Sequence, residues 1–195
     1  MKVNSNRRKL LKLFGLASTC LLTSRVKVGG AFIAYRYKSD EVPGIPDDWF
    51  ILDNNVHRYG NYILSLKLKH ITPRMVIAPH FKTRGRVRNS IPPKKMWKQI
   101  GPTLKIIDKL CDEIGAPIKE IVSVYRSPGY NKAVRGNRGS YHMTNQAIDV
   151  MFYRTSPWRV AHTARQLRAD KVFKGGIGRY SHFVHIDTRG VNADW

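Results

Sequence analysis

The stretch Ala147-Ile148-Asp149-Val150-Met151-Phe152-Tyr153 decides the fold of the C-terminal half of this chain. It is dense in apolar and β-prone side chains, which predicts a buried strand. A second run, Phe183-Val184-His185-Ile186-Asp187-Thr188, predicts another strand. Alternate side chains of a strand share a face, so His185 and Asp187 point to the same side. Each strand therefore carries a residue type that commonly binds metal ions.

Two histidines and one carboxylate make a candidate metal site around these strands. His142 lies on a loop after Gly139, seven residues before Asp149, so a short return brings both side chains to one ion with His185. Catalytic zinc takes three protein ligands and keeps a fourth position for water, whose pKa falls to about 7. The sequence therefore predicts a zinc hydrolase. Asp187 is either the base for that water or the acceptor that orients His185.

The remaining C-terminal sequence predicts helices that alternate with strands. A helix is expected over 102–114, closed by Gly115. Its apolar positions are Leu104, Ile107, Cys111 and Ile114. A strand over 118–125 leads to Arg126, and the pairs Ser127-Pro128 and Ser156-Pro157 are typical of helix starts.

The last helix and hairpin complete the predicted fold. The helix that starts at 156–157 is expected to pack through an apolar stripe of Trp158, Ala161, Ala164 and Leu167. Gly175, Gly176 and Gly178 are predicted to be turn residues of the hairpin that brings in His185. We therefore expect an α+β fold, with helices packed against a small, mainly antiparallel sheet that carries the zinc site.

The chain before residue 91 divides into two predicted segments. Residues 1–31 are expected to be an export signal of the twin-arginine type, because Asn6-Arg7-Arg8-Lys9-Leu10-Leu11-Lys12 precedes a short apolar stretch over 13–23. That stretch is too short to predict a membrane span. Residues 32–90 are expected to be an extension of short strands and loops, with strands over 62–69 and 75–78. The catalytic domain is then expected to comprise residues 91–195, and the protein is expected to be exported to the periplasm or cell wall.

Composition agrees with one globular enzyme. The 195 residues include 42% hydrophobic residues, enough for one core, and they carry a net charge of +22. Two cysteines do not make a disulfide framework. Cys111 is expected to be a buried free thiol, and Cys20 lies in the predicted export signal.

A basic run, Lys82-Thr83-Arg84-Gly85-Arg86-Val87-Arg88, is followed closely by Lys94, Lys95 and Lys98. Such runs occur on surfaces that bind nucleic acid, on surfaces that hold anionic polymers of the cell envelope, and on ordinary solvated loops. No nucleic-acid-binding motif accompanies the run, so nucleic acid is the least favoured partner.

Four ordered motifs resemble those of the zinc D-Ala-D-Ala carboxypeptidase and murein endopeptidase family, a group of metallopeptidases related to vancomycin-resistance D,D-peptidases and the hedgehog signalling domain. The motifs are Val124 to Asn131, Ser140-x-His142 with Asp149 seven residues after the histidine, Gly175 to Tyr180, and Phe183 to Asp187. The resemblance covers about residues 91–195, and Trp195 also fits. Four ordered motifs are far more specific than one.

The resemblance implies a site and a substrate. One zinc ion per chain would be bound by His142, Asp149 and His185. Arg126 would hold the substrate carbonyl or carboxylate near the metal, and Ser140 would shape the first ligand loop. Apart from the resemblance, Tyr180 and Tyr141 are candidates either to line the cleft or to pack near a strand end. The substrate would be a peptide bond in murein stems or cross-links, cut by a D,D- or L,D-endopeptidase or carboxypeptidase.

Two positions depart from the pattern of the family. Asn145 replaces the glycine usually found three residues after the first ligand, although asparagine also tolerates a left-handed backbone. His182 stands where well-studied relatives have an acidic base. The base is therefore expected to be Asp187 or His182.

Two other functions stay open. A chain that has lost catalysis would bind murein peptides or anionic polymers without cutting them. Two-histidine phosphoesterases use paired His-x-Thr/Ser motifs, and His142-Met143-Thr144 fits one of these. His185-Ile186-Asp187 does not fit, because a carboxylate does not donate to phosphate at neutral pH. The other four histidines are expected to be ordinary core or surface residues, namely His57, His70, His80 and His162.

Overall fold

The computed structural model describes residues 25–28, 31–34 and 42–195, and the chain divides into two units between Ser39 and Asp40. In the first unit, β1 (Arg25–Val28) and β2 (Ala31–Ala34) form an antiparallel hairpin. Most of the predicted export signal lies outside the described residues, so it stays a prediction. Within those residues, no helix has the length and hydropathy needed to cross a membrane.

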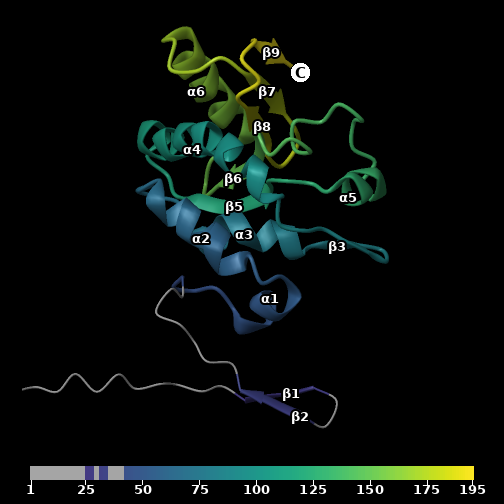
Figure 1. The fold of residues 1–195 in the computed structure, drawn as a ribbon. Helices are drawn as coiled ribbons and strands as arrows, with labels where there is room; N and C mark the ends of the chain where they lie inside the picture. The colour runs from purple at the N-terminus through teal and green to yellow at the C-terminus, as the bar shows by residue number, and fades with distance from the viewer. Residues whose placement is uncertain (1–24, 29–30, 35–41) are drawn as a thin grey trace, which may run out of the picture. The chain divides into compact units, whose positions relative to one another are not determined.

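The second unit begins with a layer of short helices (Figure 1). The helical elements are α1 (Asp47–Leu52), α2 (Val56–Ser65), α3 (Pro73–Ile77) and the 3₁₀ helices η1 (Ala78–Phe81) and η2 (Lys94–Ile100). Between η1 and η2, β3 (Thr83–Arg84) and β4 (Val87–Arg88) form a short antiparallel hairpin.

The strands predicted over 62–69 and 75–78 are wrong, because the structure places helices over the first half of 62–69 and over all of 75–78. α2 buries Val56, Tyr59, Gly60 and Ile63, which share one helix face, whereas the alternation that suggested a strand lies over 66–69, just after this helix ends. α3 begins at Thr72, whose hydroxyl accepts a hydrogen bond from the N–H of Met75 and which is followed by proline. This is the cap-then-proline start that the sequence also shows at 127–128 and 156–157.

The C-terminal part of the unit is the expected α+β arrangement of helices and one sheet. Its helices are α4 (Gly101–Ile114), α5 (Pro128–Ala133) and α6 (Pro157–Ala169). In sheet order its strands are β5 (Ile118–Ser123), β6 (Ala147–Phe152), β8 (Val184–Asp187), β7 (Gly176–Arg179) and β9 (Ala193–Asp194). Every neighbouring pair is antiparallel except β7 and β9.

The predicted helix boundaries follow from local chemistry. Gly115 ends α4 in a left-handed conformation, with φ of 69°. Ser127 and Ser156 cap α5 and α6 through side chains that accept backbone N–H groups. These three predictions are confirmed.

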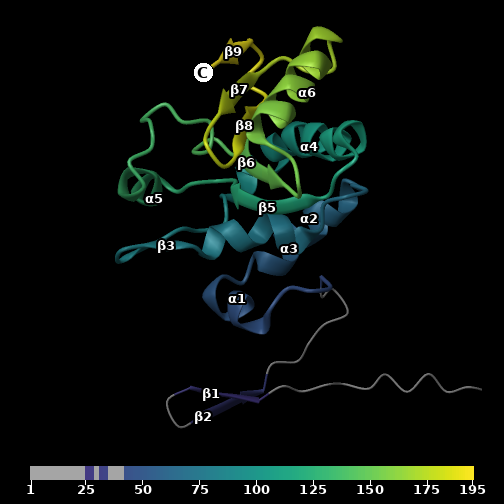
Figure 2. The ribbon, with the colours of Figure 1, turned by 180° about the vertical axis from the view of Figure 1, so that it is seen from behind.

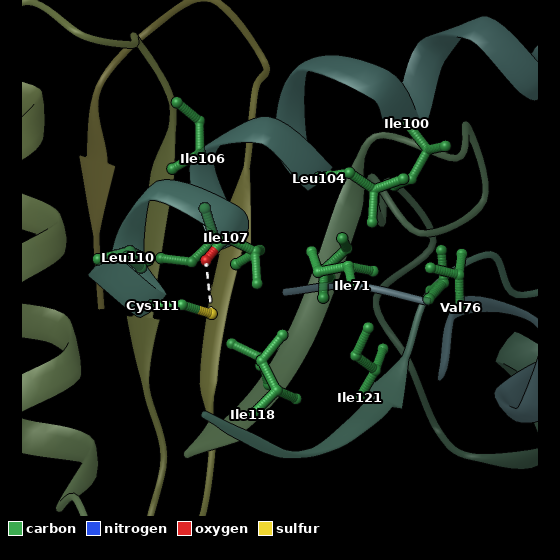
Figure 3. Close-up of a cluster of buried hydrophobic side chains, with 14 of the residues drawn as sticks. Ile71, Val76, Ile100, Leu104, Ile106, Ile107, Leu110, Cys111, Ile118 and Ile121 are labelled. Carbon is green, nitrogen blue, oxygen red and sulfur yellow. Dashed lines mark hydrogen bonds between the residues drawn. The ribbon is translucent and has the colours of Figure 1, made fainter. Parts of the chain in front are cut away.

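One hydrophobic core joins the helical layer to the sheet. Figure 3 shows side chains of α4 facing Ile118 and Ile121 of β5, with Val76 of α3 close by. The four predicted apolar positions of α4 are all buried. Cys111 is a buried free thiol, as predicted, and its S–H donates to the carbonyl oxygen of Ile107 at 3.3 Å. Residues 42–90 therefore share a core with the C-terminal part, while the functional boundary at residue 91 stays a prediction.

The apolar stripe predicted for α6 is wrong at its first position. Trp158 is 62% exposed, whereas Val160, Ala161, Ala164 and Leu167 are buried. Positions three residues apart drift around a helix by about 60° at each step, because one turn takes about 3.6 residues. Four successive positions at that spacing cannot share one face.

The register of the sheet aligns the candidate site residues. Asp149 of β6 pairs with Ser123 of β5 on one side and with His185 of β8 on the other. His185 in turn pairs with Gly178 of β7. The neighbours of the two ligands, Ile148, Val150, Val184 and Ile186, are buried in the core. Because side chains alternate along a strand, the row from Ser123 to Gly178 faces the opposite side of the sheet.

Candidate metal centre

Three side chains from two strands and one loop converge on one point. Nε2 of His142 lies 3.1 Å from Oδ1 of Asp149 and 3.1 Å from Nδ1 of His185, and the last two atoms are 2.8 Å apart. All three residues are buried. Ligand atoms of a tetrahedral zinc ion, with bonds of about 2.0–2.1 Å, stand roughly 3.3 Å from one another. The spacing therefore suits a zinc ion with only small adjustments.

Each histidine holds its ring proton on the side away from this point. Nδ1 of His142 lies 2.5 Å from the carbonyl oxygen of Val124, which only accepts, so Nδ1 carries the proton. Nε2 of His185 likewise donates to Oδ2 of Asp187 at 3.0 Å. The other nitrogen of each ring presents a lone pair towards Asp149. Three acceptors that face one another need a cation between them, and this supports metal binding.

The ionisation of His142 and Asp149 suits a metal ion, whereas at His185 a metal ion would have to compete with a proton. Burial lowers the pKa of His142 more than the Asp149 carboxylate raises it, which keeps this imidazole neutral. Burial also acts to lower the pKa of His185, but its hydrogen bonds to Asp149 and Asp187 outweigh burial and raise the pKa. Burial opposes ionisation of Asp149, yet the two histidines hold its pKa well below the usual range. The ionised Asp149 thus attracts a cation to the two ring nitrogens.

Asp187 is fully buried against the far nitrogen of His185. Besides that ring N–H, its oxygens accept the N–H of Gly176 and three donors of Arg189, namely the backbone N–H, Nε and Nη2. Burial opposes its ionisation, but the hydrogen bonds from Arg189 and His185 hold the pKa of Asp187 well below the usual range. An ionised carboxylate with five donors is a weak base. Of the two predicted roles, these contacts favour orientation of His185.

Arg126 binds the carboxylate oxygen of Asp149 that does not face the two histidines. Its Nη2 donates to Oδ2 of Asp149 at 2.5 Å, and its Nε donates to Oγ of Ser123 at 2.8 Å. Nη1 has no hydrogen-bond partner within the described chain, and the side chain lines the cleft. Arg126 therefore positions the Asp149 carboxylate and still has N–H groups for a substrate.

A cleft of about 800 Å³ opens beside the three ligands. Of the predicted substrate-binding residues, Arg126, Ser140 and Tyr180 all line it. Oγ of Ser140 also accepts the N–H of His142 at 3.4 Å, so it supports the ligand loop. His182 is exposed and is not one of the lining residues. Among the described residues that line the cleft, Asp149 is the only one with a carboxylate side chain.

One wall of the cleft is aromatic. Nε1 of Trp195 donates to the hydroxyl of Tyr180 at 2.9 Å, and Tyr180 stacks on Phe183 with 4.5 Å between ring centroids. The guanidinium of Arg189 lies 4.3 Å from the ring centroid of Tyr141 and 5.1 Å from that of Trp195. Since Arg189 also binds Asp187, this wall is connected to the support of His185.

The prediction that Gly176 and Gly178 are turn residues is wrong, because both lie within β7. A Cβ atom on Gly176 would lie 2.4 Å from Oδ2 of Asp187, and one on Gly178 would lie 2.5 Å from the ring of Trp195. The two glycines leave room for groups packed around His185. Their presence reflects close packing rather than a turn.

Sequence reasoning missed Asn89, which is 3% exposed. Its Nδ2 donates to the carbonyl oxygen of Tyr125 at 2.8 Å, and its Oδ1 accepts the N–H of Ser127 at 2.9 Å. One side chain thus holds the backbone on both sides of Arg126. These partners lie 36 and 38 residues away along the chain, so no local pattern in the sequence could have indicated them.

Asn145 stands in the first ligand loop where glycine was expected, and the structure shows how the loop accommodates it. Its φ is 58°, in the left-handed region, as the sequence led us to expect. Its Nδ2 donates to the carbonyl oxygen of Met96 at 3.0 Å. The asparagine therefore keeps the turn and also ties the ligand loop to η2.

Comparison with known proteins places this site in a wider context. A family model described as Peptidase M15 matches residues 73–187, more than half of the chain and all three candidate ligands. The match begins in α3, before the segment in which the sequence motifs lie. No curated protein and no solved structure matches the chain.

Proposed function

Because this chain belongs to the peptidase M15 family, as its motifs indicated, we propose that it is a zinc-dependent peptidase that hydrolyses peptide bonds in murein stems or cross-links. The family supports the reaction class, hydrolysis by a metallopeptidase. The observation that carries the proposal is the convergence of one carboxylate and two imidazole lone pairs beside an open cleft. One zinc ion per chain fits this donor set.

Zinc held by His142, Asp149 and His185 would supply a Lewis acid and lower the pKa of water to about 7. Two neutral imidazoles and one carboxylate leave such a site with a net charge of +1, which favours hydroxide. The chain's own residues then position the reacting groups and move the proton.

Arg126 and Asp187 have separate tasks in this proposal. Arg126 holds Asp149 through Nη2 and directs Nη1 at the substrate carbonyl, where it stabilises negative charge as it develops. Asp187 fixes the ring of His185 so that Nδ1 faces the site. His182 is the other predicted base; it lies between Tyr180 and Phe183, which line the cleft, although its own exposed side chain does not.

We also propose that the protein acts outside the cytoplasm, at the cell wall. Murein lies there, and the N-terminal Arg7-Arg8 pair with the apolar stretch after it resembles a twin-arginine signal, although Asn6 and Leu10 depart from the usual pattern.

The test is digestion of purified murein sacculi by the full chain, with and without a chelator, followed by mass spectrometry of the released fragments. We expect new fragments that disappear with the chelator and return with added zinc, and their masses would identify the bond. Protein with His142→Ala is the matched control and should release none.

A non-catalytic murein-binding protein is the second candidate. It is favoured by one observation, the lack of a carboxylate side chain other than that of Asp149 among the described residues that line the cleft. Folded, zinc-loaded protein that binds sacculi but releases no fragments would decide for this second function.

A further inference from the structure

Two segments without aspartate or glutamate come together beside the cleft. They are residues 54–107, which supply the β3–β4 hairpin, and residues 121–148, which supply α5 and the loop after it. The hairpin and α5 are in contact. Figures 1 and 2 show them on the same side of the second unit. The fold therefore collects basic side chains from two parts of the chain. The carboxylate at the base of the hairpin, Glu120, is paired with Lys82 at 2.8 Å.

These basic side chains form a surface that we call the cationic rim. It consists of Arg84, Arg86, Arg88, Lys132, Arg135 and Arg138. All six residues are exposed, and none forms an ion pair with another described residue.

Several basic residues elsewhere in the unit form ion pairs with carboxylates. Lys69 binds Asp112, Lys109 binds Glu113, and Arg165 and Arg168 both bind Asp194. The rim is thus a concentration of positive charge without internal compensation. Such a surface attracts anions and is relieved of self-repulsion when they bind.

The cationic rim is continuous with the cleft. Lys82, immediately before β3, and Arg135, after α5, both line the cleft. A polymer that places a peptide in the cleft therefore meets the rim with its neighbouring groups. In the two segments that supply the rim, the structure exposes no aromatic side chain on which bases would stack, and the exposed rings of Tyr180 and Trp195 belong to the wall of the cleft. Continuity and composition together favour a substrate polymer over nucleic acid.

We propose that the cationic rim binds carboxylates of the same murein polymer whose peptide enters the cleft. This inference rests on the proposed function and extends it, because it makes affinity for the polymer depend on free carboxylates outside the scissile bond. Each exposed charge pair contributes little to the binding free energy, so several pairs must act together. Because salt screens exposed charges, the affinity must fall as the salt concentration rises.

The test measures binding separately from hydrolysis. Full-length protein carrying His142→Ala, which removes turnover, is sedimented with native sacculi and with sacculi whose carboxylates have been amidated. The same assay uses a rim variant with Arg84→Gln, Arg86→Gln and Arg88→Gln added. The matched control adds Lys105→Gln, Lys171→Gln and Lys174→Gln, exposed residues of α4 and of the loop before β7.

We expect the rim variant to bind native sacculi about five- to tenfold more weakly at low salt, and amidation of the sacculi to cause a similar loss. The control should bind as the parent does. Thermal unfolding midpoints verify that each variant is folded. Equal binding by the rim variant and its parent, or binding unchanged by amidation, would overturn the proposal.

Two further readouts separate the alternatives. If the rim variant loses affinity for duplex DNA but keeps its affinity for sacculi, the partner is nucleic acid and the proposal is wrong. If the wild-type chain digests no sacculi while the rim variant still loses binding, the rim stands and the proposed peptidase activity fails.

Discussion

Two regions of this protein bury a histidine in similar surroundings, yet only one of them resembles a metal site. In the helical layer, Nδ1 of His80 bonds the carbonyl oxygen of Ile77 at 3.1 Å. In the metal centre, Nδ1 of His142 bonds the carbonyl oxygen of Val124 in the same way. The other nitrogen of His142 meets Asp149 and His185, whereas that of His80 has no hydrogen-bond partner among the described residues.

The comparison separates burial from coordination. His80 lies among aromatic rings, with Tyr59 and Tyr125 at centroid distances of 5.8 and 6.5 Å, and burial lowers its pKa to about 4. A buried, oriented imidazole is thus compatible with a plain core. A metal site needs a second lone pair and a negative charge at the same point.

The sharpest test of this difference exchanges the two histidines for other residues. We expect His142→Ala to abolish stoichiometric zinc binding and to reduce hydrolysis more than about 100-fold, because residues that only support ligands already account for 10–100-fold. His80→Gln should keep both. Zinc content after desalting and fragment release from sacculi measure the two effects. One zinc ion retained by the His142→Ala protein would contradict our assignment.

A second test concerns the support of His185, which His80 lacks. Asp187→Asn should weaken zinc binding about 10–100-fold, since the acceptor that fixes the ring is altered. Competition with a chromogenic chelator measures the affinity. Unchanged zinc affinity with lost turnover would instead make Asp187 the base. His182→Gln is the companion variant, and we expect it to keep zinc affinity and change the pH profile of kcat.

The stability of the protein should fall at acidic pH because His80 is buried in its neutral form. The imidazole has a pKa of about 6.5 in the unfolded chain and about 4 in the folded one, so the unfolded state takes up the proton first as pH falls. The contribution of neutral His80 to the free energy of unfolding is fully present above pH 6.5 and is lost progressively as the pH falls to 4. At pH 5 the loss is about 2 kcal/mol.

Denaturant unfolding of metal-free protein at pH 7 and pH 5 checks this prediction. His80→Gln should lose about 2 kcal/mol less than the wild type between the two values. Identical pH dependence in both proteins would show that His80 is not held neutral.

The smallest expected effect concerns the connection between the two regions. Asn89→Ala removes two buried hydrogen bonds that hold the backbone around Arg126, so we expect a loss of about 1–2 kcal/mol of stability. Turnover should fall a few-fold while zinc affinity is kept, because Arg126 moves and the ligands do not. Asn54→Ala, at an exposed position, is the control. Unchanged kcat with reduced stability would make Asn89 a purely structural residue.

Short sequence patterns predicted the local secondary structure around the site. Ser127-Pro128 and Ser156-Pro157 start helices, Gly115 ends one, and the run at 147–153 becomes β6. One prediction failed because a short alternation near residue 66 suggested a strand, although the buried helix face begins ten residues earlier, at Val56. Another failed because residues at a constant spacing of three were expected to share a buried face, which wrongly placed Trp158 in the core. Both errors come from patterns too short to distinguish one periodicity from another.

The sequence by itself determined the three candidate ligands and their family, because motif order and residue type are properties of the chain. Only the tertiary structure decided which nitrogen of each histidine faces the site, why Asp187 is a weak base, and that Asn89 supports Arg126. These features depend on partners such as Val124, 18 residues from His142, and His185, 43 residues from it. Hydrogen bonds over such separations form only when the sheet is paired in one register, so no local pattern encodes them.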